Sequence, residues 1–276
     1  AYDPRLIGQG EDWQFVDEDL KANYAQSGGR SISEWAYAAG DPQLQQRKQD
    51  LKCYLQERCN RFLGTEFQVG EETPVVAVRS RLTEQKGFDL ILRGLRDWRS
   101  AEPVQFVIVA WGEERYAKEL RKLAASHPQW IAFSDSWRAA PEPLHYAGAD
   151  FLLMPSLFEP CGLPHMMALR YGTIPIVRQT GGLADVVQDY DRSSKTGNGF
   201  VFRAPDVEEM LHVTGRSLET YHQHPEHWRE LMATAMQARD QWGHDFTWTT
   251  AANRYLTELY ELDDRADTGR HSAGGI

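Results

Sequence analysis

The sequence predicts an α/β fold in which a doubly wound parallel sheet carries helices on both faces. From about residue 73 onward, short apolar runs alternate with segments whose apolar residues recur at helical spacing. The run 74–78, Pro-Val-Val-Ala-Val, is typical of a strand buried on both faces. The composition agrees, because 41% of the residues are hydrophobic and 11% are aromatic, which is enough for a core.

Residues 1–69 are expected to form a loop-rich and helical lead-in to this domain. Turn-forming residues crowd the first 45 positions, where we expect one short helix near 17–24. Between Leu44 and Leu63 the apolar residues return at helical spacing and the opposite face is charged, which predicts a longer helix.

Strands and helices are expected to alternate through the next part of the chain. The strand-like runs are 74–78, 106–109, 130–133, 151–154, 173–177 and 199–202. Helical spacing is found at 88–98, about 114–125, about 143–147 and in a stretch that ends at Tyr171. Strands separated in this way by helices form βαβ units, whose strands are parallel.

The last part of the chain is predicted to be helical. Helices are expected at 207–221, 225–242 and 247–262, with Asp206 and Thr247 as N-cap residues. We therefore divide the chain into the lead-in 1–69, an α/β domain at 70–245, a closing helix at 246–262 and a disordered tail at 263–276.

Charge and cysteine content exclude several classes of function. A formal net charge of −10 argues against general binding to nucleic acid or to anionic membranes, so an anionic ligand would need a local basic site. Three cysteines without CxxC spacing indicate neither a disulfide framework nor a zinc site, and they favour the cytoplasm. No stretch approaches the roughly 20 apolar residues of a membrane span.

The candidate chemistry lies in loops that follow predicted strands. Arg81 and Lys86 follow the run 74–78, Glu159 follows 151–154, and a Thr-Gly-Gly sequence at 180–182 follows 173–177. In a parallel sheet, loops at the carboxyl ends of strands bind ligands, and helix amino termini there attract phosphate. The sequence therefore predicts an anion site at this edge.

Each of these candidates also has an ordinary structural explanation. Arg81 and Lys86 could be solvated loop charges, and Glu159 could cap the following helix. The Thr-Gly-Gly sequence could be a plain strand-to-helix turn. Cys161 could be a nucleophile, although a small packed loop residue is the preferred interpretation.

Four blocks of sequence resemble one known family. The blocks 80–89, 156–163, 168–173 and 180–185 are similar, in this order, to signatures of the bacterial glycogen synthase and plant starch synthase family. The resemblance covers roughly residues 70–262. It implies the carboxyl-terminal, Rossmann-like half of a two-domain retaining glycosyltransferase, the half that binds the nucleotide-sugar donor.

The resemblance also implies roles for particular residues. Arg81 and Lys86 match the family's phosphate-binding cations, and Glu159 matches the carboxylate that contacts the donor sugar and helps to position it. The matching donor-binding residues are Cys161, Gly162, Leu163, Thr180, Gly181, Gly182 and Leu183. The implied reaction transfers glucose from ADP-glucose to an α-1,4-glucan, with no cofactor and no metal, and UDP-glucose is the less favoured alternative donor.

The implied partner is the family's amino-terminal acceptor domain, whose Lys-Thr-Gly-Gly loop does not occur in this sequence. The alternatives are a fragment that binds a nucleotide sugar or a partner chain without activity, or another two-domain transferase of the sucrose or trehalose type. Many of the latter have a second Glu where Met167 stands. The resemblance implies a cytoplasmic location, or a plastid in a plant or alga.

Three positions depart from the family pattern. Trp111 lies in an Ala-Trp-Gly-Glu sequence where the family often has Gly-x-Gly-Asp, and Pro164 and His165 replace a common Thr-Gln pair. The lost Thr hydroxyl would otherwise reach phosphate, and we expect Trp111 to crowd the nucleotide side of the site.

Overall fold

The computed structural model describes residues 40–70, 72–98, 103–136, 142–239, 246 and 248–259. The chain divides into two compact units at the boundary between Ala238 and Arg239, and each unit is described by itself. Three expectations lie outside the described residues: the helix near 17–24, the cap at Thr247 and the tail at 263–276.

The larger unit is built on a six-stranded sheet in the order β3-β2-β1-β4-β5-β6. All neighbouring strands are parallel. The strands are β1 Val75–Leu82, β2 Gln105–Gly112, β3 Ile131–Ser134, β4 Phe151–Met154, β5 Ile174–Arg178 and β6 Phe200–Phe202. This order reverses direction between β1 and β4, which is the position where doubly wound sheets bind ligands. The expected fold class is confirmed.

Strand β1 is longer than its apolar run predicts. Its pairing with β2 continues from Val75 beside Gln105 to Leu82 beside Gly112. The prediction that Arg81 lies in a loop is therefore wrong, because hydrogen bonding to β2 keeps the backbone extended beyond the β-branched residues. Arg81 is instead the second-to-last residue of β1, at the carboxyl end of the strand.

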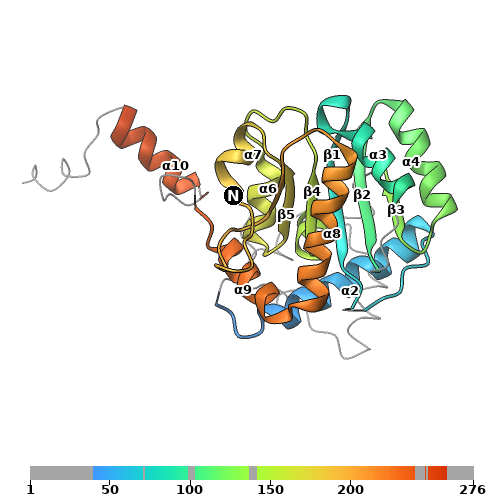
Figure 1. Cartoon of the computed structure of the whole chain (residues 1–276), viewed down its shortest axis with the longest axis horizontal. Coiled ribbons are helices and arrows are strands. Elements are labelled where there is room, and N and C mark those ends of the chain that lie inside the picture. Colours follow the sequence, from blue (N-terminus) through green and yellow to red (C-terminus); the bar gives the residue numbers. More distant parts are fainter. Residues whose placement is uncertain are drawn as a thin grey trace, which may run out of the picture. The chain divides into compact units, whose positions relative to one another are not determined.

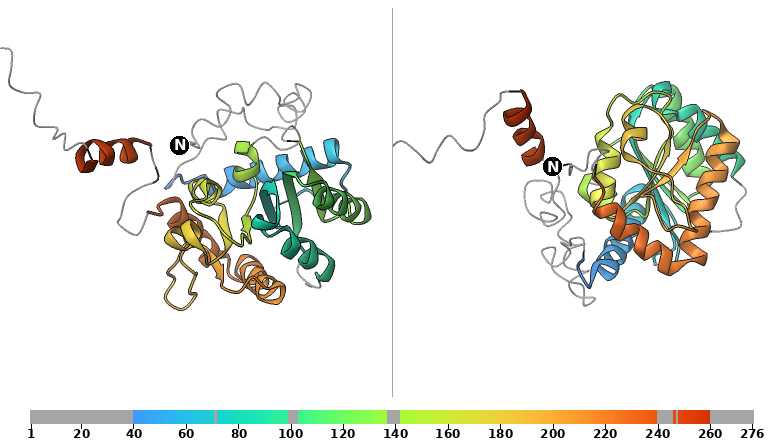
Figure 2. Two further views of the ribbon diagram at one scale, coloured as in Figure 1. Left: turned by 90° about the horizontal axis from the view of Figure 1, so that it is seen from above. Right: turned by 60° about the vertical axis from the view of Figure 1, so that its left-hand side comes forward.

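Helices cover both faces of the sheet (Figures 1 and 2). On one face α3 contacts both α4 and α8, and on the other α5 contacts both α2 and α6. The helices of this unit are α2 Leu44–Leu63, η4 Glu84–Lys86, α3 Phe88–Asp97, α4 Glu114–Ser126, α5 Glu142–Ala147, α6 Leu163–Arg170, α7 Gly181–Val186, α8 Val207–Gln223 and α9 Pro225–Met236. No helix in the described ranges is long and apolar enough to cross a membrane.

Helix α2 differs from its expected pattern of one apolar and one charged face, because several of its polar residues are buried. Lys48 Nζ donates to the carbonyl of Ala149 at 2.7 Å and to Thr173 Oγ1 at 2.8 Å. Lys52 Nζ lies 3.2 Å from Asp150 Oδ2. These contacts join α2 to the segments that lead into β4 and β5, so the lysines attach the helix to the amino end of the sheet.

The carboxyl-terminal helices follow the expected order with one shorter member. Asp206 caps α8 as predicted, since its side chain accepts from the backbone N–H groups of Glu208 and Glu209. Helix α9 ends at Met236 rather than at 242, because its buried stripe ends there and Gln237 is exposed. The smaller unit contains α10 Trp248–Arg254 and the π-helical turn η5 Tyr255–Leu259.

Candidate functional site

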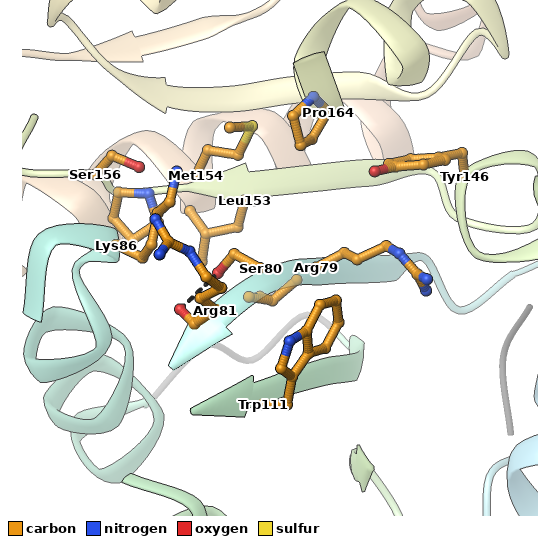
Figure 3. A pocket seen from close by; sticks show the side chains of 12 residues that line it. Arg79, Ser80, Arg81, Lys86, Trp111, Tyr146, Leu153, Met154, Ser156 and Pro164 are labelled. Carbon is orange, nitrogen blue, oxygen red and sulfur yellow. Dashed lines mark hydrogen bonds between the residues drawn. The ribbon is translucent and has the colours of Figure 1, made fainter. Parts of the chain in front are cut away.

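A pocket of about 220 Å³ opens at the reversal point of the sheet, between the carboxyl ends of β1 and β4 (Figure 3). Strand β1 supplies four consecutive lining residues, β4 and the loop after it supply four more, and helices α5 and α6 supply one each. The lining residues are Val78, Arg79, Ser80, Arg81, Lys86, Trp111, Tyr146, Leu153, Met154, Pro155, Ser156 and Pro164.

The charge of this pocket is opposite to that of the chain. Among its described lining residues are three cations, Arg79, Arg81 and Lys86, and no carboxylate. The whole chain carries a formal net charge of −10, so the cations create a local basic site of the kind that an anionic ligand would need.

Lys86, which lines the pocket, forms an ion pair with Glu159, which is not among the lining residues. Their Nζ and Oε2 atoms are 2.5 Å apart, and the two side chains are only 15% and 7% exposed. Ser156 Oγ donates to the same carboxylate oxygen at 3.2 Å. Glu159 does not cap the following helix, whose N-cap is Gly162 and which has no side-chain cap. The carboxylate is instead fixed across two loops, beside the cations.

The loop that carries Glu159 is anchored on both sides by hydrogen bonds to its backbone. On one side, Gln85 Nε2 donates to the carbonyl of Phe158 at 2.9 Å, and the Leu157 N–H donates to the Gln85 carbonyl at 2.8 Å. On the other side, Arg178 at the end of β5 donates to the carbonyls of Ser156 and Leu157. The loop is therefore held between the ends of β1 and β5.

Three glycines let the site loops touch through their backbones. A Cβ at Gly87 would lie 2.1 Å from the Pro155 carbonyl oxygen, and one at Gly181 would lie 2.1 Å from that of Glu159. A Cβ at Gly182 would lie 2.1 Å from the carbonyl oxygen of Cys161. Real Cβ atoms essentially never approach so closely, so these positions require glycine. The predicted Thr-Gly-Gly segment is therefore more than a plain turn, because its backbone packs directly on the Glu159 loop.

Some of the predicted donor-binding residues form this packing contact, and others are exposed at the surface. Thr180 is the N-cap of α7, and helix α7 begins at Gly181, so the glycines belong to its first turn. Leu183 is buried in the next position. Leu163 is the first residue of α6, and its side chain is 55% exposed to solvent.

Cys161 is exposed, so the expectation of a packed side chain is wrong. The packing at this position is made by its carbonyl group against Gly182, which leaves the thiol outside. The three cysteines all lie in the described ranges, and none of them forms a disulfide there: they are Cys53, Cys59 and Cys161.

His165 is completely buried behind this loop. Neither ring nitrogen has a hydrogen-bond partner among the described residues. Burial lowers the pKa of His165 to about 4, so the imidazole is neutral near neutral pH. A Cβ at Gly162 would lie 3.0 Å from Glu159 Cγ and 3.1 Å from His165 Nδ1, so the ring and the carboxylate side chain approach the same glycine.

Sequence reasoning missed several residues that shape the site. Arg79 and Tyr146 line the pocket, and Arg178 anchors the Glu159 loop. Arg79 could have been noticed, because a charged residue directly follows the β-branched run of β1. Tyr146 and Arg178 gave no local signal. Within the described ranges, no group of three or more His, Cys, Asp or Glu residues could hold a metal ion.

The strand order defines the chain as a Rossmann-like domain, with a cationic pocket at the point where the order reverses. The chain belongs to the family of glycosyl transferases group 1, which it matches over residues 65–230. It is 37% identical over 231 residues to a glycogen synthase of Thermotoga maritima, a match that spans 84% of this chain and 45% of that protein. A glycogen synthase of Geobacillus thermodenitrificans is 41% identical over 204 residues, or 73% of this chain and 40% of that protein.

A solved structure supports the same relationship. The catalytic domain of starch synthase IV from Arabidopsis thaliana, bound to ADP and acarbose, has a TM-score of 0.66 and 27% identity. The match covers 94% of this chain and 54% of that one. The resemblance to glycogen and starch synthases is thereby confirmed. The chain spans about half the length of the curated relatives it matches.

Proposed function

We propose that this chain is the donor-binding half of a retaining glycosyltransferase that moves glucose from ADP-glucose to an α-1,4-glucan. UDP-glucose is the second candidate donor. The single observation that carries the proposal is the cationic pocket at the reversal point of the sheet, whose lining residue Lys86 is paired with Glu159. Relatives named glycogen synthase and the ADP-bound starch synthase support the choice of substrate.

In this proposal the cations receive the diphosphate. When the glycosidic bond breaks, negative charge grows on the distal phosphate of the leaving nucleotide, and fixed cations that stabilise this charge lower the barrier. Arg81 and Lys86 line the pocket and are positioned for that role. Because Lys86 is held by Glu159 at 2.5 Å, little reorganisation of its side chain is needed.

Glu159 and the glycine-rich loops are assigned to the sugar. The carboxylate accepts hydrogen bonds, so it suits the hydroxyl groups of glucose, and its loop is fixed by Gln85 and Arg178. Further ligand contacts are proposed for residues 161–163, which follow Glu159 in the same loop, and for residues 180–183 of the Thr-Gly-Gly segment. Helices α6 and α7 both begin beside these loops, at Leu163 and Gly181.

The proposed partner is the amino-terminal acceptor domain, because the curated relatives are more than twice as long as the matched region. Transfer in the cleft between the domains would exclude water from the reaction. We place the reaction in the cytoplasm, or in a plastid for a plant or alga, and assign it no cofactor and no metal.

Calorimetric titration of the chain with ADP, ADP-glucose and UDP-glucose tests the proposal. The variant Arg81→Ala/Lys86→Ala should lose saturable binding. Arg93→Ala/Lys118→Ala, which removes the same charge from exposed positions on α3 and α4, should retain it. Equal binding by both variants would contradict the site assignment.

Incorporation of labelled glucose into glycogen, measured on the same preparation, separates the two candidate functions. Transfer by the chain itself would support a complete active site. Binding without transfer would support the alternative of a donor-binding fragment that needs its partner domain.

A further inference from the structure

We propose that Arg178 is a positioning residue, which sets the place of Glu159 for the donor sugar by holding the loop that carries this carboxylate. All three guanidinium nitrogens of Arg178 are used in hydrogen bonds to main-chain carbonyl groups, so the residue acts through Glu159. This inference rests on the proposed function, because it assigns to Arg178 the part of the donor affinity that the sugar contributes.

Arg178 joins three segments at the carboxyl edge of the sheet. It is the last residue of β5. Its Nε donates to the carbonyl of Ser156 at 2.8 Å, its Nη2 donates to that of Leu157, and its Nη1 donates to that of Arg203 at 3.3 Å. Ser156 and Leu157 belong to the Glu159 loop, and Arg203 follows β6. Because a guanidinium group is planar and its N–H groups point in set directions, it fixes this loop relative to the ends of β5 and β6.

The Arg203 end of this network is held by the first turn of α8. Glu209 accepts from the backbone N–H groups of Arg203 at 3.0 Å and of Ala204 at 2.6 Å. Asp206, the N-cap of the helix, accepts from two further backbone N–H groups of the same turn. The carbonyl that Arg178 contacts is therefore attached to a capped helix, which gives the side chain a firm support.

Ser156 connects the anchored backbone to the Glu159 carboxylate. Its carbonyl accepts from Arg178, while its Oγ donates to Glu159 Oε2 at 3.2 Å. Lys86 Nζ lies 2.5 Å from the same oxygen. The other oxygen, Oε1, receives no hydrogen bond from the described residues, so it is the atom that a sugar hydroxyl would meet. A shift of the loop would therefore move this acceptor away from the sugar.

The other neighbours of the loop hold it less firmly than Arg178 does. Gln85 Nε2 donates to the Phe158 carbonyl at 2.9 Å, and the Gly182 N–H donates to the Glu159 carbonyl at 3.0 Å, and both donors are neutral. His165 is buried behind the loop, but its ring nitrogens have no hydrogen-bond partner in the described part of the chain. Hydrogen bonds from a charged donor are roughly twice as strong as neutral ones, so the guanidinium group is the principal anchor.

The test compares a ligand that contains the sugar with one that does not. Dissociation constants for ADP-glucose and ADP, or for UDP-glucose and UDP if the chain prefers them, are measured by calorimetry for the unmodified chain and its variants. Arg178→Met should weaken the nucleotide sugar about tenfold and the free nucleotide less than about twofold, because a hydrogen bond to the carboxylate is lost only with the sugar. General destabilisation of the fold would affect both ligands alike.

Two further variants make the result specific to the hydrogen bonds of Arg178. Arg203→Met removes the same charge from an exposed side chain nearby and leaves the Arg203 carbonyl in place, so both affinities should change less than about twofold. Arg178→Lys keeps the charge without the planar fork, so its loss for the nucleotide sugar should lie between the losses of the other two variants. The lysine variant provides the measurement if Arg178→Met does not fold.

A double variant tests whether Arg178 acts through Glu159. Glu159→Gln alone should weaken the nucleotide sugar, and Arg178→Met added to it should cause no further loss, since both changes remove the same contact. Losses that multiply in the double variant would mean that the two residues act independently, which would overturn the inference.

Two results with Arg178→Met alone would also overturn the inference. Equal losses for the nucleotide sugar and the free nucleotide would mean that Arg178 supports the whole site, and unchanged affinities would mean that the position of Glu159 does not depend on it. Absence of binding by the unmodified chain to any of these ligands would instead refute the proposed function, and with it this inference.

Discussion

Replacing Gly182 by Ala tests whether the site loops depend on backbone contact. The new Cβ would lie 2.1 Å from the carbonyl oxygen of Cys161 and 2.7 Å from its carbon. Real Cβ atoms essentially never come within 3.0 Å, so the loop carrying Cys161 would have to move by about 1 Å. Forced overpacking of this kind costs roughly 1–3 kcal/mol, and we expect a loss near 2 kcal/mol.

Gly215→Ala is the matched control. Gly215 also lies in a helix, α8, but a Cβ there would meet nothing within 4 Å. Without a clash, the substitution should stabilise the chain by about 0.5–1 kcal/mol, because alanine loses less backbone entropy than glycine on folding. The two variants therefore make the same chemical change with opposite expected signs.

Thermal and urea unfolding measure the difference. For a domain of this size, the loss at Gly182 should lower the melting temperature by roughly 4–8 °C, whereas Gly215→Ala should raise it by roughly 1–4 °C. A Gly182→Ala protein that is as stable as Gly215→Ala would refute the argument that the loops are in backbone contact.

Three further predictions concern stability and are tested by urea unfolding. Asp206→Ala should cost about 1 kcal/mol, because the cap of α8 is lost, while Asp206→Asn should retain most of it. Lys52→Met should cost roughly 3 kcal/mol, because Asp150 remains buried without its partner, and Lys52→Met/Asp150→Asn should recover part of the loss. The third concerns His165, whose folded pKa of about 4 is below the ordinary value of 6.5. The unfolded chain therefore binds the proton first, and this stability, complete above pH 6.5, should fall by up to about 3 kcal/mol as the pH drops to 4.

Each of these predictions has a result that contradicts it. Equal losses for the alanine and asparagine variants would reject the cap at Asp206. A double variant at Lys52 and Asp150 whose loss equals the sum of the single losses would mean that the pair is not coupled. His165→Gln should reduce the slope of stability between pH 6.5 and 4, and an unchanged slope would reject a neutral buried His165.

The fold followed from the sequence because strands buried on both faces must be apolar throughout. The runs at 151–154 and 173–177 match β4 and β5 to within one residue. Strand ends were less predictable, since Arg79 to Leu82 are held in β1 by pairing with β2 rather than by their own propensity. The burial of Lys48 could not be predicted either, because its acceptors are carbonyl groups about 100 positions away.

The candidate site was predicted in its parts but not in its contacts. Loops at strand ends identified Lys86 and Glu159 separately, yet the two residues are 73 positions apart and no local spacing could have paired them. The place of Arg79 could not be predicted from local pattern, because the apolar run that indicates the strand ends at Val78 whereas β1 continues to Leu82. Sequence patterns thus located the carboxyl edge of the sheet. They could not show that Tyr146 lines the pocket, because this depends on how α5 packs in the folded chain.

The glycine contacts between the site loops have a consequence for how such a domain can change. The loops are spaced by main-chain contacts at Gly87, Gly181 and Gly182, and these contacts require glycine at the three positions. The side chains that face the pocket, such as Arg79 and Trp111, take no part in that spacing. Evolution or protein engineering can therefore exchange these side chains to suit another ligand, while the spacing of the site loops is retained.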